Sequence, residues 1–166
     1  MAALTKLESK LAEVLGLAMA AQDAVQEVRG MLGSKKQYEP LEKKLKQARE
    51  DARETQKRCT EFASSFKGKK TAILDEAREV KQEATEMREA YLADEEDPLD
   101  GFEFLTMAEA GEVGHWSIVA KLNEKAGNAE LRTLTDWALP IQQRHLQEVL
   151  DGSLKLAADE DPNEEA

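Results

Sequence analysis

The sequence of 166 residues is poor in the residues that usually cross-link or interrupt a chain. It contains a single cysteine, Cys59, so an internal disulfide framework and a zinc finger are excluded. Glycine and proline number only 9 and 4, too few for the many turns of an all-β fold. Aromatic residues make up 5% of the chain, so its core must be built mainly from Leu, Val, Ile and Ala. These deficits favour long helices.

Positive charge and long apolar runs are also scarce. The chain has 23 Lys and Arg against 34 Asp and Glu, a net charge of −11, and such an acidic surface is unsuited to coating nucleic acid. The N-terminal stretch resembles a signal peptide, but Glu8, Lys10 and Glu13 interrupt it, and no apolar run approaches the length that a bilayer requires. We therefore expect a soluble, cytoplasmic protein with no membrane segment.

Apolar residues recur in steps of three and four along most of the chain, the spacing that places them on one face of a helix. The first such seam runs from Leu4 to Leu32 and ends at Gly33. Four further seams follow, over residues 41–66, 73–91, 102–122 and 131–156. The third and fourth are separated by a charged loop, 94–101, and the last two by a turn at Gly127 and Asn128.

Short links of this kind force neighbouring helices to run in opposite directions. The sequence therefore predicts an all-α fold, an antiparallel bundle of about five helices that forms one domain over residues 1–156. The remaining segment, 157–166, is acidic, and we predict that it is a disordered tail.

Two ionisable residues interrupt the seam of the fourth helix. Glu112 and His115 stand where the first three helices place apolar residues or Thr55. Burying a carboxylate and an imidazole without partners costs several kcal/mol. Their Glu-x-x-His spacing directs both from one helical face, which is how helical bundles hold iron or manganese.

The fifth helix repeats the anomaly with His145, which has Gln142 three residues before it and Glu148 three residues after it. If the last two helices fold back about Gly127, Glu112 faces Gln142 and Glu109 faces His145. The two histidines are then offset by about 9 Å along the axis, too far to share one ion directly but tolerable for two ions bridged by Glu112. A buried, hydrogen-bonded polar cluster without metal is the alternative interpretation.

Residues 100–150 resemble the last two helices of ferritin-like bundles, and in particular those of the small bacterial ferritin-like stress proteins. The likeness rests on an Ala-rich helix with a Glu/His pair followed by Trp, on a short Gly turn and on a final amphipathic helix; the matching residues are Glu112, His115, Trp116, Gly127 and His145. It implies a ferritin-like, metal-binding stress protein that holds iron or manganese. Its principal ligands would be Glu112, His115 and His145, and its secondary ligands Glu109, Gln142 and Glu148.

The chain departs from the ferritin-like pattern in its ligand set. Ferritin-like di-metal sites take carboxylates from all four helices and use two Glu-x-x-His pairs. Here the second pair is Gln142-x-x-His145, and the seams of the first three helices carry no acid. The resemblance therefore implies a reduced or lost site. If iron binds with an open position, oxidation of iron or reaction with peroxide is the expected chemistry.

Two other function classes compete with metal binding. The seams of the first three helices and the charge-segregated surface fit a metal-free interaction module or a homo-oligomer. Residues 35–70 carry 12 Lys and Arg against 6 Asp and Glu. They are the only candidate segment for binding nucleic acid. A solvent-exposed helix face on which Lys and Arg form ion pairs with Asp and Glu is the simpler interpretation.

Overall fold

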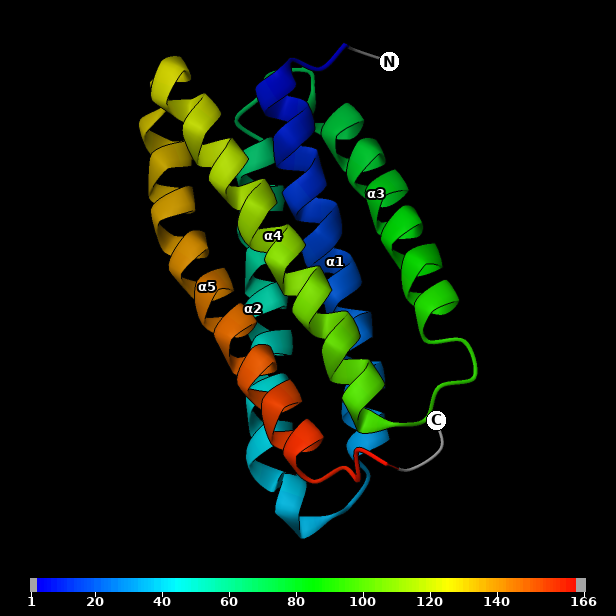
Figure 1. Ribbon diagram of the computed structural model, residues 1–166. Coiled ribbons are helices and arrows are strands. Elements are labelled where there is room, and N and C mark those ends of the chain that lie inside the picture. Colours follow the sequence, from blue (N-terminus) through cyan, green and yellow to red (C-terminus); the bar gives the residue numbers. More distant parts are fainter. Residues whose placement is uncertain (1–2, 164–166) are drawn as a thin grey trace.

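The computed structural model describes residues 3–163 and consists of five long helices with one short 3₁₀ turn (Figure 1). No strand occurs among these residues. The predicted all-α bundle is thus confirmed. The helices are α1 (Lys6–Leu32), α2 (Glu39–Ala63), α3 (Lys70–Tyr91), α4 (Pro98–Ala126) and α5 (Ala129–Ala158), with the 3₁₀ turn η1 (Lys36–Tyr38) before α2.

Four of the helices close into a ring, and the fifth lies outside it. α1 packs on α2 and α4, and α5 closes the ring by packing on the same two helices. α3 packs on α1, touches α2 only slightly, and runs in the same direction as α1 (Figure 1). Helices that follow one another in the chain run in opposite directions, as predicted, so α1 and α3, which are two links apart, run in the same direction.

The close approach of α3 to α1 depends on Gly16. A Cβ atom at this position would lie 2.5 Å from the carbonyl oxygen of Ala77 and 2.7 Å from Cβ of Val80. Only a hydrogen atom fits there, so a glycine in the middle of α1 lets the backbones of the two helices come together.

Capping residues set the helix ends. Thr5 and Glu8 form a reciprocal capping box at the start of α1. The Asp97 side chain accepts a hydrogen bond from the Leu99 amide, and Pro98 occupies the first turn of α4. The helix therefore begins at Pro98, and the charged loop predicted over 94–101 is wrong in its second half.

The turn between α4 and α5 is determined by the residues of the turn itself. Gly127 adopts the left-handed conformation with φ 68°, and the Asn128 side chain caps α5 through the Leu131 amide. α5 continues as far as Ala158, so the predicted tail 157–166 begins inside the helix. Residues 164–166 of that tail lie outside the described residues.

The core consists of two apolar clusters at opposite ends of the ring. One cluster contains the fully buried Trp116 with Leu11 and Leu131, and the other contains Phe102 with Val28 and Leu45. Buried polar side chains from α2, α4 and α5 occupy the level between them. The fold thus places a polar layer at mid-height.

Candidate functional site

The polar layer joins side chains of three helices, all buried except for partly exposed Asp51. α2 contributes Asp51, α4 contributes Glu109 and Glu112, and α5 contributes Gln142 and His145. The carboxylates and the imidazole lie between apolar clusters, where a polar group without partners is costly. Their hydrogen bonds therefore decide what the layer can do.

His145 is held between two carboxylates and is only 2% exposed. Its Nε2 lies 2.9 Å from Asp51 Oδ2, and its Nδ1 lies 3.6 Å from Glu109 Oε2. Arg144 also donates to Asp51. Burial alone would lower the pKa of His145, but Glu109 and Asp51 outweigh that effect and raise it above its ordinary value. The site favours an imidazolium balanced by carboxylates.

Glu112 is the most strongly perturbed acid of the layer. Gln142 Nε2 donates to Glu112 Oε2 at 2.6 Å and reaches Glu109 Oε2 at 3.4 Å. Burial, reinforced by the nearby Glu109 carboxylate, raises the pKa of Glu112 well above its usual range, and the bond from Gln142 opposes this only in part. The layer therefore favours a protonated Glu112.

The register predicted from the turn at Gly127 is confirmed. Glu112 faces Gln142 and Glu109 faces His145, as the two contacts above show. Four of the six residues predicted as metal ligands thus come together. Asp51, the fifth member of the layer, was missed because it lies beside the α2 seam, three residues after Ala48 and one before Ala52.

His115 belongs to a different part of the molecule. Its side chain is 37% exposed, and its Nδ1 contacts Glu13 Oε2 on α1 at 2.9 Å. The buried face of α4 instead carries Glu109, Glu112 and Trp116, so the prediction that His115 points inward is wrong. Placing the large indole in the core removes more apolar surface from water than placing an imidazole there.

Glu148 forms no hydrogen bond with the other predicted ligands among the described side chains. It borders a cavity of about 10 Å³ that His145 also lines. Within residues 3–163, no three or more His, Cys, Asp or Glu side chains are grouped so that they could hold a metal ion. The six residues therefore do not form one coordination sphere.

A groove of about 320 Å³ runs between α3 and α4. We call it the α3–α4 groove. Its floor is formed by α1 alanines, and its walls are formed by apolar side chains of α3 and by α4 residues that include Gly111 and the edge of Glu112. The lining includes Ala20, Ala24, Ala84, Met87, Phe104, Met107 and Gly111.

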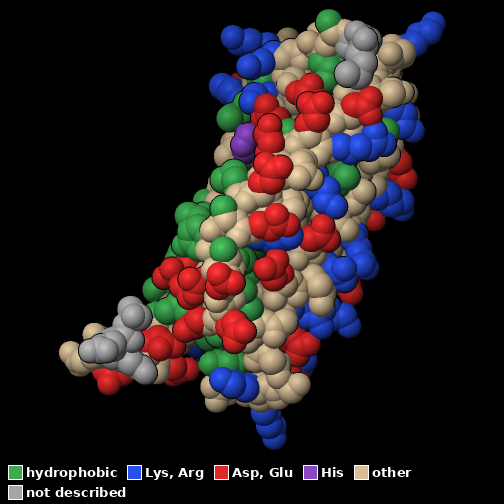
Figure 2. Space-filling model, turned by 90° about the vertical axis from the view of Figure 1, so that its right-hand side faces the viewer, with side chains coloured by type: hydrophobic (Ala, Val, Ile, Leu, Met, Phe, Trp, Pro, Cys, Tyr) green, Lys and Arg blue, Asp and Glu red, His purple; other side chains and the backbone are tan. Residues whose placement is uncertain are grey.

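The walls of the groove expose large apolar side chains. Met87 is 69% exposed on α3, and Met107 is 53% exposed on α4. The rings of Tyr91 on α3 and Phe104 on α4 contact each other in a tilted arrangement, with 5.6 Å between their centroids. In Figure 2, hydrophobic side chains gather along the left edge of the molecule. This edge belongs to the face that points toward the viewer in Figure 1. An apolar patch bordered by charge is typical of an interaction surface.

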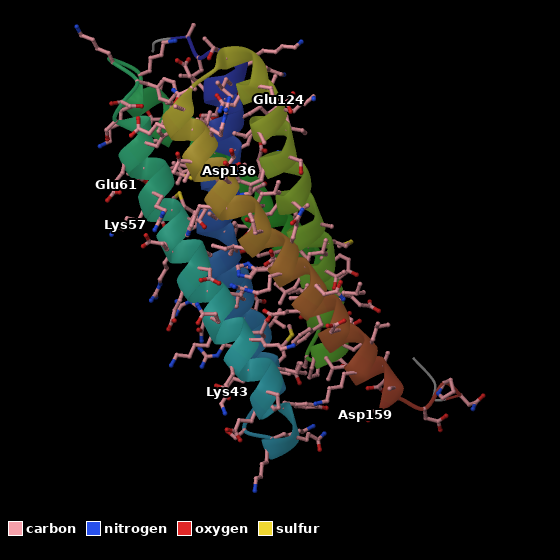
Figure 3. All side chains as sticks on the ribbon, turned by 90° about the vertical axis from the view of Figure 1, so that its left-hand side faces the viewer. Lys43, Lys57, Glu61, Glu124, Asp136 and Asp159 are labelled. Carbon is pink, nitrogen blue, oxygen red and sulfur yellow. The ribbon has the colours of Figure 1, made fainter. Side chains whose placement is uncertain are left out.

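The outer face of α2 is charged rather than apolar. Lys43 pairs with Glu39 at 2.9 Å, and Arg58 pairs with Glu54 at 2.8 Å. Lys43, Lys57 and Glu61 follow one another along this face (Figure 3). The basic segment 35–70 is therefore interleaved with acids. None of the described helices is apolar over a stretch long enough to cross a membrane.

Comparison of the chain with protein-family models, with curated proteins and with solved structures finds no match.

Proposed function

We propose that this protein is a helical interaction module that receives the apolar face of a partner helix in the α3–α4 groove. The observation that carries the proposal is the incomplete burial of α3. Its apolar seam continues through Ala84, Met87 and Tyr91, but its only buried residues are Ile73 and Ala77. A helix whose apolar stripe extends beyond its intramolecular contacts has surface left for a partner.

The shape of the groove favours a helix as the occupant. Along α4 its lining runs from Phe104 to His115, a length of about 16 Å at a rise of 1.5 Å per residue. That length matches about three turns of a docked helix, which presents apolar anchors at positions i, i+3 or i+4, and i+7. Flexible methionines on both walls adapt to the side chains that they meet.

The chain offers a matched pair of variants for testing this function. Gly111 lines the groove and Gly114 does not, yet a Cβ atom added at either position meets nothing within 4 Å. Both are exposed glycines inside α4. Gly111→Trp should fill the groove, while Gly114→Trp changes helix propensity in the same way and leaves the groove open.

The assay titrates a fluorescently labelled, uncharged amphipathic peptide of about 20 residues, long enough to form a helix, and follows its anisotropy. We expect wild type and Gly114→Trp to bind it, and Gly111→Trp to bind at least about tenfold more weakly. Equal affinities for both variants, or no binding to wild type, would contradict the proposal. Sedimentation equilibrium identifies self-association, since a dimer that Gly111→Trp dissociates would make a second copy the occupant.

Metal binding is a second candidate function, favoured by the surroundings of His145. Two carboxylates from two other helices flank its ring, and the 3.6 Å between Nδ1 and Glu109 Oε2 is longer than a hydrogen bond. Imidazole and carboxylate suit iron or manganese, and the carboxylate on the second ring nitrogen is a common feature of metal-bound histidines. The resemblance of residues 100–150 to ferritin-like stress proteins also supports this candidate.

Elemental analysis of protein purified without metal-affinity chromatography tests this candidate. His145→Ala should lose near-stoichiometric iron or manganese, and His115→Ala, which changes the exposed histidine, should retain it. A thermal melt of each variant separates loss of a ligand from loss of folding. Equal trace metal in wild type and both variants would rule the candidate out.

A further inference from the structure

The end of the α3–α4 groove where the two helices are joined is densely acidic. Acidic side chains line the connection and the first turn of α4: Asp94, Glu95, Glu96, Asp97 and Asp100. We call these five residues the acidic loop. None of the ion pairs formed among residues 3–163 involves any of them. The negative charge is therefore not neutralised within the fold.

We infer that the partner of the α3–α4 groove is a cationic amphipathic helix, whose apolar face covers Met87 and Met107 and whose Lys or Arg residues lie against the acidic loop. The inference rests on the proposed function, because it names the chemistry of the segment that the groove receives. Apolar contact supplies the affinity, and complementary charge sets the partner and its orientation.

The local electrostatics support a cationic partner. Asp100, Asp97 and Asp94 crowd Glu95 and raise its pKa above the ordinary value, as expected for carboxylates without a nearby cation. Arg88, which lines the groove, is already paired with Glu27 at 2.8 Å. Acidic side chains also lie beside and below the hydrophobic patch in Figure 2. A cation on the partner would relieve repulsion that the fold leaves in place.

The same charges argue against a second copy of this chain as the occupant. Each copy carries a net charge of −11, so two copies repel one another as they approach. A partner with positive charge beside its apolar face meets no such barrier, and its association is accelerated at low salt.

Three labelled peptides with the same apolar face test the inference. One is uncharged, one carries three Lys at one end, and one carries three Glu at the same end. We expect the Lys peptide to bind wild type about tenfold more tightly than the uncharged peptide at low ionic strength, and the Glu peptide to bind more weakly. The advantage of the Lys peptide should disappear in about 1 M salt, where the screening length falls to about 3 Å.

Two double variants locate the effect. Glu95→Gln/Glu96→Gln neutralises two exposed members of the acidic loop. Glu61→Gln/Asp136→Asn makes the same change in net charge on the opposite side of the molecule (Figure 3). The first variant should lose most of the preference for the Lys peptide and keep its affinity for the uncharged peptide. The second should behave as wild type.

The outcomes separate this inference from the proposed function. If no peptide binds, the groove is not a helix-binding site and both fail. If all three peptides bind alike, the groove receives helices but the partner is not selected by positive charge, and the inference is overturned. Equal loss of preference in the two double variants would attribute selection to net charge rather than to the acidic loop, which also overturns it.

Discussion

Replacing Gly16 by alanine should loosen the attachment of α3 to the ring, since the added Cβ would lie 2.5 Å from the Ala77 carbonyl oxygen. That atom belongs to the backbone of α3, so relief requires a shift of the helix rather than a rotamer change. Overpacking of this kind costs about 1–3 kcal/mol, whereas Gly to Ala inside a helix by itself gains about 1 kcal/mol. The net change measured for Gly16→Ala is therefore a difference of two opposing terms.

Gly114→Ala provides the matched control, because it lies inside α4 and its added Cβ meets nothing within 4 Å. Subtracting its effect cancels the helix propensity and leaves the cost of displacing α3. We expect Gly16→Ala to be about 1–3 kcal/mol less stable than Gly114→Ala in urea unfolding followed by circular dichroism. Equal stability of the two variants would refute the close contact between α1 and α3 on which the groove depends.

Three other predictions concern the core. The pKa values of Glu112 and His145 are both raised, so the stability that each adds is fully present below its unfolded-state value, 4.5 and 6.5 respectively, and is lost as the pH rises through its folded-state value. Glu112→Gln should therefore gain stability relative to wild type between about pH 5 and pH 8 in urea unfolding, and a constant difference would contradict the assignment. Burial raises the pKa of Cys59 to about 12, so its thiol should react with Ellman's reagent only after unfolding, and rapid reaction of the native protein would show that it is accessible. Trp116 is fully buried and its Nε1 has no hydrogen-bond partner among the described residues; Trp116→Phe should thus lose much less stability in thermal melts than Trp116→Ala, for which about 3–5 kcal/mol is expected.

Local features of the sequence predicted much of the fold. The apolar seams located the helices, and Gly127 with Asn128 located the turn between the last two. A short turn also fixes the register of the hairpin that it joins, which is why the sequence alone pairs Glu112 with Gln142 and Glu109 with His145. These inferences needed no knowledge of which other helices lie nearby.

Features that depend on distant neighbours were not predictable in this way. Successive residues of a helix differ in direction by about 100°, so the prediction of the inward residue changes from His115 to Trp116 when α4 is rotated by that angle about its axis. Asp51 joins the polar layer because α2 lies beside α5, and α3 packs closely against α1 because Gly16 admits it. Each outcome is decided by tertiary packing, which a seam on a single helix does not encode.

The small number of buried residues on α3 also bears on local unfolding of the protein. Because α3 buries only Ile73 and Ala77, while the other four helices close a ring without it, we expect release of α3 as a unit to be the least costly opening of the structure. Its amide protons should then exchange with solvent at a rate set by that local opening rather than by global unfolding. An occupant that bridges α3 and α4 would restrain this opening.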